Sequence, residues 1–593
     1  QYFDWIYRRS RLTIKKKIQT CNLEDKESLN QWIQLNNLSN NLSKLPKYIL
    51  NLYKSEKIVV KNLPESWNYY VYNSFLKQIF KANKNLSKYI EAPIKEKIPE
   101  FRKLDKEITE GKKIQLIQNL LAMEIPEGIS KGKTSNYTEK GLIDREIQKK
   151  KAYIPFRQLL KRAGNAMRAI KPCYMLSPVS LSQICEQKAG LFDVLIMDEA
   201  SQMRIEDSLG SILRSKQCII VGDPQQLPPT PFFMPDYGDI VEDEDIEDDE
   251  SVLDLALSKY QPKRFLQWHY RSRHESLIQF SNFNFYNNKL IVTPSANPEF
   301  AIKHHFVQGT YNTKINEKEV EAIVKGIIEF MNEPKNLNKS CLVATMNMSQ
   351  RHLIDEAITN ELRHNIVAAD YVQYWETMDG NEFRVKNLEN VQGDERDVIF
   401  ISTLFGPNKD GVVMQRFGPI NQKNGYRRLN VLFTRARERV ELYTSLHPSD
   451  IKVDAYAKGR TVLKNYIEYA KTKKLDTGTV SGRDFDSPFQ DWVIDALKKL
   501  GYEAVPEVGV AGYFIDIGIK HPSYKYGYLA GIECDGRAYH SSLSVRDNDI
   551  IRQKVLEGLG WNIYRIWSTD WYQDPNKELK TLDNYLKLRL RKK

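Results

Sequence analysis

The sequence lacks the features of a disulfide-stapled, zinc-binding or membrane-spanning protein. Its six cysteines are scattered along 593 residues, and none of them forms a Cys-x-x-Cys pair. This distribution argues against a zinc site or a disulfide framework, and it is typical of a protein of the reducing cytoplasm. No segment reaches the ~18 consecutive apolar residues that a membrane helix needs, and the first residues do not read as a signal peptide. We therefore expect a cytoplasmic protein with no membrane partner.

Charge and length set the broad class of the protein. The content of 41% hydrophobic and 28% charged residues describes an ordinary globular chain. The net charge is +12 and the sequence pI is about 9.0, which favours a polyanionic partner such as nucleic acid. Solvated surface lysines would give the same charge, so the motifs have to decide. At roughly 100–200 residues per domain, the length predicts three or four domains.

Hydrophobic periodicity divides the chain into helical and α/β parts. Within residues 1–170, apolar side chains three and four positions apart predict amphipathic helices, for example over Ser74–Lys81 and Asp144–Ala163. From residue 171 onward, short apolar strands end in polar loops. The predicted strands are Phe192–Met197, Cys218–Val221, Cys341–Thr345 and Asp397–Leu404. Strands that alternate with helices predict two parallel sheets, whose ligands lie at the carboxyl ends of the strands.

Two adjacent carboxylates follow the first predicted strand. Val194–Met197 is a run of four apolar residues, which predicts a buried strand, and Asp198 and Glu199 come directly after it. One carboxylate, Asp198, could hold Mg²⁺, because that ion prefers oxygen ligands. The other, Glu199, could polarise the water that attacks a phosphoryl group.

Five motifs in order resemble those of superfamily 1 helicases, on the branch that includes the nonsense-mediated-decay RNA helicases. The motifs are Asp198–Ser201, Gly222–Pro229, Trp268–Arg271, Val391–Asp397 and Arg428–Arg437. The resemblance implies ATP and Mg²⁺ as cofactors and Asp198 as the residue that holds the metal. It also implies the nucleotide-binding residues Gln226, Arg271, Gly393, Glu395 and Arg435.

The resemblance further implies how these residues act on the nucleotide. The two arginines, Arg271 and Arg435, would reach the charge of the transferred phosphoryl group from the second sheet, as arginine fingers do. The amide of Gln226 would sense the phosphate, and Glu395 would contact the nucleotide sugar. For each arginine, the alternative is a surface ion pair.

The phosphate-binding loop that such a motor needs, Gly-x-x-x-x-Gly-Lys-Ser/Thr, is absent from the sequence. Gly128–Thr134 comes nearest, but it has three residues between its glycines instead of four, and no apolar strand precedes it. In the family, the loop precedes the Asp-Glu motif, and this chain begins with Gln1 rather than Met. We therefore expect the loop upstream of Gln1, in a missing N-terminal part of the same protein, and we expect residues 1–593 alone to hydrolyse ATP poorly.

The last hundred or so residues carry a second set of carboxylates. The predicted elements here are a helix at Pro488–Leu500 and strands at Tyr513–Ile519 and Tyr528–Gly536. Because side chains alternate along a strand, Glu533 and Asp535 share a face, and the neighbouring strand could bring Asp516 beside them. Such carboxylates repel one another unless a divalent metal lies between them, and that metal can generate a hydroxide nucleophile. The alternative is an exposed acidic face on a β-hairpin.

This region resembles the Vsr-like endonucleases appended to large bacterial helicases, which are a variant of the PD-(D/E)xK fold. The runs that carry the resemblance are Ile532–His540, Arg546-Asp547, Leu556–Trp561 and Arg565–Trp571. The resemblance implies that Asp516 and Glu533 hold the metal and that His540 assists water activation or leaving-group protonation. It places Asp535 where the general fold has lysine. The family's opening helix typically carries a glutamate where this chain has Gln490, and a carboxamide binds metal more weakly, so reduced activity is expected.

We thus predict an α/β protein with two RecA-like parallel-sheet motor domains, the first of them incomplete, and a C-terminal α/β domain like a restriction endonuclease. The predicted parts are a helical arm inserted in the first motor domain (1–170), the back half of RecA-like domain 1 (171–265), RecA-like domain 2 (266–447), a helical segment and linker (448–486) and the Vsr-like endonuclease domain (487–593).

The predicted activity is that of an ATP-dependent DNA helicase or translocase coupled to a Mg²⁺-dependent DNA endonuclease. Its partners would be single- and double-stranded DNA and other defence proteins, in bacterial defence against foreign DNA. Two alternatives stay open. The chain could be a nucleic-acid-binding regulatory module with a decayed nuclease, as Gln490 and the absent phosphate loop suggest, or a helicase directed to RNA, because the similar motors include RNA helicases.

Overall fold

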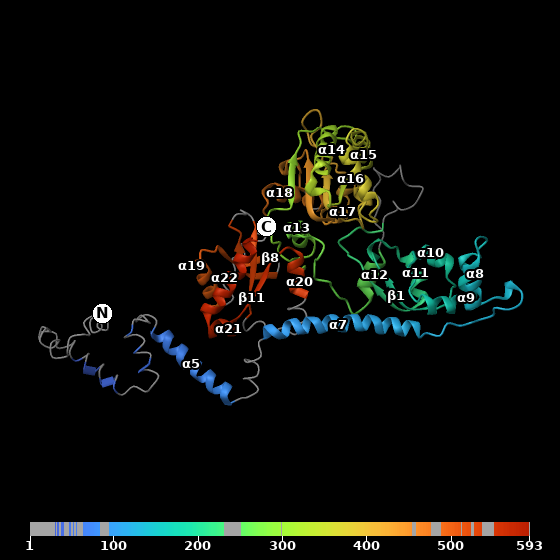
Figure 1. The fold of residues 1–593 in the computed structure, drawn as a ribbon. Helices are drawn as coiled ribbons and strands as arrows, with labels where there is room; N and C mark the ends of the chain where they lie inside the picture. Colours follow the sequence, from blue (N-terminus) through green and yellow to red (C-terminus); the bar gives the residue numbers. More distant parts are fainter. Residues whose placement is uncertain are drawn as a thin grey trace. The chain divides into compact units, whose positions relative to one another are not determined.

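The computed structural model describes most of the chain from residue 94 onward. The described ranges are 94–229, 251–297, 299–453, 458–475, 488–510, 513–522, 527–535 and 551–591, with helix α5 (Leu63–Ala82) and scattered residues between 30 and 55. The chain divides into two compact units, Gln1–Gln118 and Asn119–Lys593. Helices α5 and α7 (Ile94–Leu121) confirm the helical character predicted for the N-terminal part (Figure 1). No described helix is both long and apolar enough to cross a membrane.

The helix predicted over Asp144–Ala163 is interrupted. The structure has α8 (Glu139–Gln148) and α9 (Phe156–Ile170), with non-helical residues between them. Pro155 is the N-cap residue of α9. Proline has no backbone N–H and disfavours helical conformation in the residue before it. The prediction of a continuous helix was therefore wrong at this point.

The first sheet has two parallel strands, β1 (Phe192–Met197) and β2 (Ser215–Ile220). Met197 and Leu195 pack in a small core with residues of α11 (Ile205–Leu213) and α12 (Val252–Lys259). The prediction of a buried β1 was wrong for Val194 and Ile196, whose exposures are 47% and 66%. A parallel sheet is normally covered on both faces, but the described residues leave these two side chains of β1 exposed.

The second sheet has five parallel strands in the order β3-β7-β6-β4-β5. The strands are β3 (Ile302–Phe306), β4 (Cys341–Thr345), β5 (Val385–Asn387), β6 (Arg396–Ser402) and β7 (Ala436–Thr444). Every residue of β4 and β6 is buried, as expected for the central strands of a parallel sheet. The predicted strands at Cys341–Thr345 and Asp397–Leu404 are thus confirmed, apart from one or two residues at the ends of β6.

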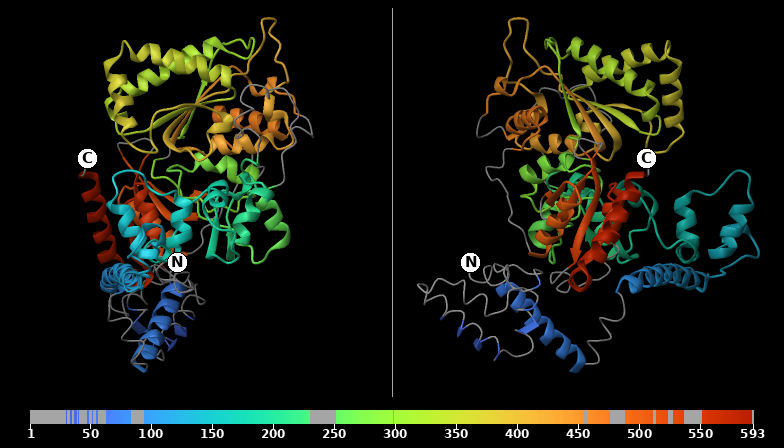
Figure 2. Two further views of the ribbon diagram at one scale, coloured as in Figure 1. Left: turned by 90° about the vertical axis from the view of Figure 1, so that its right-hand side faces the viewer. Right: turned by 60° about the vertical axis from the view of Figure 1, so that its left-hand side comes forward.

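Side chains of β4 alternate between two hydrophobic cores, one on each face of this sheet. Cys341 and Val343 pack with one group of helices, and Leu342 and Ala344 pack with the other. The first group is α14 (Glu317–Asn332), α15 (Met348–Leu362) and α16 (Ile366–Glu376), and the second is α13 (Ser276–Phe285), α17 (Gly425–Phe433) and α18 (Lys458–Thr472). Figure 2 shows the two groups on opposite sides of the sheet. The sheet is thus the middle layer of a three-layer α/β architecture, which agrees with the parallel sheet predicted for RecA-like domain 2.

The C-terminal domain is built on a mixed four-stranded sheet in the order β11-β10-β9-β8. Its strands are β8 (Ala504–Val510), β9 (Tyr513–Lys520), β10 (Tyr528–Asp535) and β11 (Ile563–Trp567). The pairs β8–β9 and β9–β10 are antiparallel, whereas β10–β11 is parallel. Helices α19 (Pro488–Lys499) and α22 (Pro575–Arg591) pack on one face. The predicted helix and both predicted strands are confirmed.

The C-terminal domain is bound to the motor through an irregular segment, residues 291–296. The indole Nε1 of Trp561 donates to the carbonyl oxygen of Pro294 at 2.9 Å. The backbone N–H of Tyr528 donates to the carbonyl oxygen of Ala296 at 3.1 Å. Ile291 and Ala296 also pack against the buried cluster that contains Trp561 and Tyr513. Polar and apolar contacts therefore join the two domains, and we call this contact the docking site.

Candidate functional site

The two motor carboxylates lie at the carboxyl end of β1, as predicted. Asp198 and Glu199 are exposed, and the backbone N–H of Glu199 donates to Asp198 Oδ1 at 3.0 Å. Glu199 has a left-handed backbone with φ of 53°. Its Oε2 atom accepts from the amides of Gln202 and Gln392, each at 3.3 Å. Because Gln392 follows β5 of the second sheet, Glu199 faces both halves of the motor.

Further polar contacts join the two halves beside these carboxylates. The Nε2 atom of Gln392 lies 3.4 Å from Gln226 Oε1. Tyr286 Oη donates to Asp223 Oδ2 at 2.6 Å, and Asn430 Nδ2 lies 2.9 Å from Tyr286 Oη. Gln392 and Asn430 stand inside motifs, so the sequence offered a signal for them. Tyr286 is outside every motif and could not have been found.

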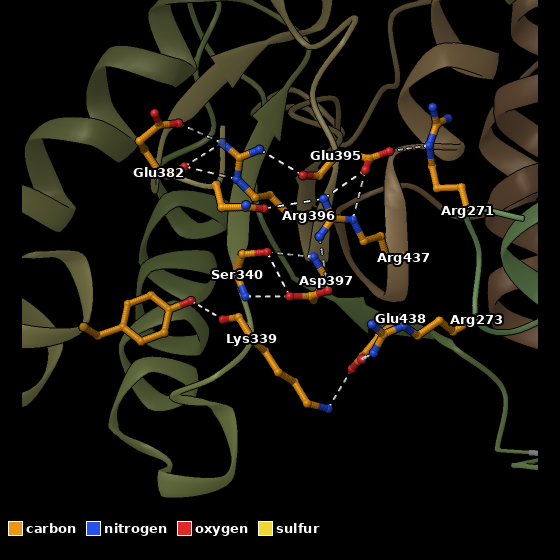
Figure 3. A network of polar contacts seen from close by, with 12 residues as sticks. Arg271, Arg273, Lys339, Ser340, Glu382, Glu395, Arg396, Asp397, Arg437 and Glu438 are labelled. Atoms are coloured by element: carbon orange, nitrogen blue, oxygen red, sulfur yellow. Dashed lines mark hydrogen bonds and ion pairs between the residues drawn. The ribbon is translucent and has the colours of Figure 1, made fainter. Parts of the chain in front are cut away.

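The predicted nucleotide residue Glu395 lies between two arginines in the network of Figure 3. Arg271 Nε is 2.7 Å from Glu395 Oε2, and Arg437 Nη2 is 2.9 Å from Oε1. Burial acts in the opposite direction, but the guanidinium of Arg271 and then that of Arg437 lower the pKa of Glu395. Arg271 therefore does form an ion pair, while its role at a phosphate stays a prediction. Nearby Gly393 has a φ of 83°, a conformation that glycine adopts without strain.

Arg435 is 3% exposed, so the alternative of a surface ion pair does not fit it. Its Nε donates to the carbonyl oxygen of Val431 at 2.8 Å. Burial, and next the charge of Arg271, lower the pKa of Arg435 to about 10, and the charge of Glu199 opposes this. Arg435 therefore lies within electrostatic range of Glu199, which follows the first sheet, and of Arg271 and Glu395 on the side of the second sheet.

The run Gly128–Thr134 is not preceded by a strand in the structure. Helix α7 ends at Leu121, and the described residues from there to Lys133 contain no strand. A phosphate-binding loop connects a strand to a helix, so this run lacks that context.

In the C-terminal domain, the structure brings Asp516 and Glu533 together. Asp516 is on β9, and its Oδ2 accepts from the backbone N–H of Cys534 on β10 at 2.6 Å. Burial and the charge of Glu533 raise the pKa of Asp516 to about 7. A divalent cation between the two carboxylates would relieve this repulsion, so the pair fits the metal that the sequence predicts.

Glu533 and Asp535 are both buried, so the alternative of an exposed acidic face does not fit. Burial raises the pKa of Asp535 to about 6, although the charge of Arg565 on β11 opposes it. Arg565 Nε lies 3.0 Å from Asp535 Oδ2. Asp535 thus stands beside Glu533 and is paired with a cation of its own.

Arg552 is a residue of this site that the sequence did not indicate. It is the N-cap residue of α20 (Gln553–Gly558). Its Nη2 donates to Glu533 Oε1 at 3.0 Å and to the carbonyl oxygen of Phe514 at 2.7 Å. Its guanidinium lies over the ring of Tyr513, 4.1 Å from the centroid. A half-buried cation therefore contacts one of the two predicted metal ligands.

Two predicted features of this site remain open. Gln490 is 5% exposed, and its Oε1 atom finds no hydrogen-bond partner in the described part of the chain. His540 lies outside the described residues. Within the ranges that the structure describes, no group of three or more His, Cys, Asp or Glu residues is arranged to hold a metal ion. The pair of carboxylates, Asp516 and Glu533, is what the described residues offer.

Three family models match the chain. Two of them are described as an AAA domain and match residues 54–232 and 299–444. The third, REase_MTES_1575, matches residues 489–586. The matched regions contain the motor carboxylates, Glu395 with Arg435 and Arg437, and the buried carboxylate pair, whereas Arg271 lies between the two AAA matches.

Curated relatives are helicases. The chain is 27% identical over 446 residues to an uncharacterised ATP-dependent helicase, the MG140 homolog of Mycoplasma pneumoniae, and 26% identical over 441 residues to MG140 of Mycoplasma genitalium. Each alignment covers 70% of this chain and 38% of the relative. Helicase sen1 of Schizosaccharomyces pombe is 26% identical over 263 residues, 42% of this chain and 14% of the relative. The chain thus spans well under half the length of these relatives.

Proposed function

The chain combines AAA domains of the superfamily 1 helicases with a nuclease-like REase_MTES_1575 domain, and on that premise we propose that it is a DNA helicase or translocase that delivers a Mg²⁺-dependent endonuclease. The net charge of +12 supports a nucleic-acid partner. We place the activity in the bacterial cytoplasm, in defence against foreign DNA, because the predicted architecture resembles that of large bacterial helicases with an appended endonuclease.

The motor chemistry is proposed for the residues that line the junction of the two sheets. Mg²⁺ held by Asp198 would neutralise phosphate charge. Glu199 would orient the attacking water, and Gln226 would contact the phosphate. Arg271 and Arg435 would stabilise the negative charge that spreads over the oxygens of the transferred group. Arg271 would then share its guanidinium between Glu395 and the phosphate.

The nuclease chemistry is proposed for the buried pair Asp516 and Glu533. Mg²⁺ held there would supply a hydroxide nucleophile and stabilise charge on the phosphate. The two carboxylates would fix where the cation binds, and the Asp535–Arg565 ion pair joins β10 to β11. His540 would move the proton of the water or of the leaving group. The single observation that carries this proposal is the contact of Asp516 with the backbone beside Glu533, on adjacent strands.

A cleavage assay tests the proposal. Purified protein is incubated with single-stranded DNA, double-stranded DNA or RNA, with Mg²⁺ or with EDTA, and Asp516→Ala is compared with the wild type. Exposed Asp495 on α19 gives a matched control, Asp495→Ala. We expect Mg²⁺-dependent DNA cleavage that falls about 100-fold or more in Asp516→Ala and is unchanged in Asp495→Ala.

The other outcomes support the alternatives. Cleavage in EDTA, or equal cleavage by Asp516→Ala, would overturn the nuclease assignment. No cleavage by any of the proteins favours a binding module with a decayed nuclease, an outcome that the buried Gln490 makes worth testing. Preferential cleavage of RNA favours an RNA-directed enzyme.

A further inference from the structure

The segment that carries Arg271 also contacts the nuclease domain. Trp268 lies three residues before Arg271, and its ring meets that of Tyr513 edge to face, with centroids 5.6 Å apart. The segment is fixed to the docking site, because the N–H of Ile291 donates to the Gln267 carbonyl at 2.8 Å and the N–H of His269 donates to the Ile291 carbonyl at 3.2 Å. A motor motif is therefore in direct contact with the first residue of β9.

Tyr513 in turn contacts the cation that binds Glu533. Its buried ring carries the guanidinium of Arg552, and a cation over a desolvated aromatic ring is held more strongly than one in water. Arg552 Nη2 reaches Glu533 Oε1 at 3.0 Å. Three side-chain contacts thus connect Trp268 to a predicted metal ligand.

We propose that Trp268, a residue of the motor, is a positioning residue of the nuclease site: it holds Tyr513, and through Tyr513 it holds Arg552 and the carboxylate of Glu533. This inference rests on the proposed nuclease function. A carboxylate that binds metal works within a narrow range of orientations, and the groups behind it set that orientation. Arg271, in the same segment as Trp268, forms an ion pair with Glu395, a predicted nucleotide-binding residue. A movement of this segment on nucleotide binding would therefore also move the side chain of Glu533.

The proposal also assigns a role to Arg552. Its guanidinium binds Glu533 and the Phe514 carbonyl together, so it ties the carboxylate of β10 to the backbone of β9. Replacing it by glutamine, Arg552→Gln, removes the charge and most of the donors of this fork. If Trp268 acts through Arg552, Trp268 loses its influence on the nuclease in that variant.

A double-mutant cycle tests this connection. Wild type, Trp268→Ala, Arg552→Gln and the double variant are compared by kcat and KM for DNA cleavage, and by Mn²⁺ affinity from calorimetry. The titrations are carried out in an Asp198→Asn background, so that the motor metal site does not contribute. Controls are Trp268→Phe, which keeps a ring, and Leu266→Ala, a change of a side chain in the same segment that is 83% exposed.

We expect Trp268→Ala to lower kcat roughly three- to tenfold and to weaken Mn²⁺ binding, with KM unchanged. Trp268→Phe should restore both to within about twofold, and Leu266→Ala should match the wild type. In the Arg552→Gln background, Trp268→Ala should add nothing, because coupled residues are not additive.

The opposite results are decisive. Multiplicative losses in the double variant, or no difference between Trp268→Ala and Leu266→Ala while the wild type cleaves and binds Mn²⁺, overturn this inference and leave the nuclease function intact. Absence of both cleavage and Mn²⁺ binding in the wild type overturns the nuclease function, and this inference with it.

Discussion

At the scale of single residues, two carboxylates of β10 each meet a cation from a later part of the chain: Arg552 contacts Glu533, and Arg565 contacts Asp535. Strand alternation places Glu533 and Asp535 on one face, and the neighbouring strand supplies Asp516. Arg552 and Arg565 come from elements that follow later in the chain, and no spacing indicates which carboxylate each one meets. Sequence patterns encode local periodicity, whereas these ion pairs depend on how β11 and α20 pack.

The raised pKa of Asp516 predicts a pH-dependent metal affinity. Burial and Glu533 raise this pKa to about 7, so the folded protein holds a proton there at pH 6 that it has mostly lost at pH 8. A bound cation must displace that proton. We expect Mn²⁺ affinity at the nuclease site to rise roughly tenfold from pH 6 to pH 8.

Calorimetry in two buffers with different ionisation enthalpies measures the proton release directly. Near pH 6 it should approach one proton per Mn²⁺ bound, and near pH 8 it should fall towards zero. Asp516→Asn should bind more weakly, and without this pH dependence. The same affinity at both pH values in the wild type would contradict the prediction.

At the scale of helices and strands, the apolar runs predicted the elements well and their ends less well. β1 and β4 have the predicted bounds, whereas β2 begins earlier than predicted, at Ser215. The first residues of β2 are polar and so carry no apolar pattern that indicates a strand, yet pairing with β1 holds them in the sheet. The exposure of Ile196 could not be predicted either, because burial depends on what covers a strand and not on its own side chains.

Because Glu319, in the first turn of α14, is buried, we expect the stability of the folded protein to depend on pH. Its carboxylate is fully buried and accepts from Ser402 Oγ at 2.6 Å and from the Leu404 backbone N–H at 2.7 Å. Burial raises its pKa to about 7, while an unfolded glutamate has a pKa of about 4.3. Between these values the folded state binds more protons than the unfolded state, so the free energy of unfolding falls as the pH rises.

The variant Glu319→Gln should lack this pH dependence. Relative to wild type, it should gain stability between pH 5 and pH 7.5, by at most ~3 kcal/mol. Urea unfolding of both proteins at the two pH values measures the change. Exposed Glu317, in the same helical turn, provides the control Glu317→Gln, whose stability difference from wild type should not change with pH. A difference that is the same at both pH values for Glu319→Gln would contradict the assignment.

At the scale of the whole molecule, the contact between motor and nuclease could not be predicted from the sequence. The docking site on the motor consists of residues 291–296, which contain no motif and no regular element. Its partner Trp561 is part of a run that resembles the nuclease family, and in a sequence it reads as a core residue of that domain. The structure shows that it serves the core and the contact at once, because its ring is buried while its Nε1 reaches Pro294.

We therefore expect substitutions of Trp561 to weaken both the nuclease domain and its contact with the motor. Trp561→Phe keeps most of the apolar volume but removes the hydrogen bond to the Pro294 carbonyl, which should cost about 1 kcal/mol. Trp561→Ala also opens a cavity beside Tyr528 and Leu556, which should cost ~3–5 kcal/mol. Scanning calorimetry should show the nuclease transition at a lower temperature in both variants, with the larger shift for alanine. Trp492→Phe, at a half-exposed tryptophan of α19 in the same domain, should shift it little. Trp561 packs in the same buried cluster as Tyr513, the residue that Trp268 contacts. Trp561→Ala should therefore also reduce DNA cleavage at temperatures where the nuclease domain is still folded; full cleavage there would show that docking and catalysis are independent.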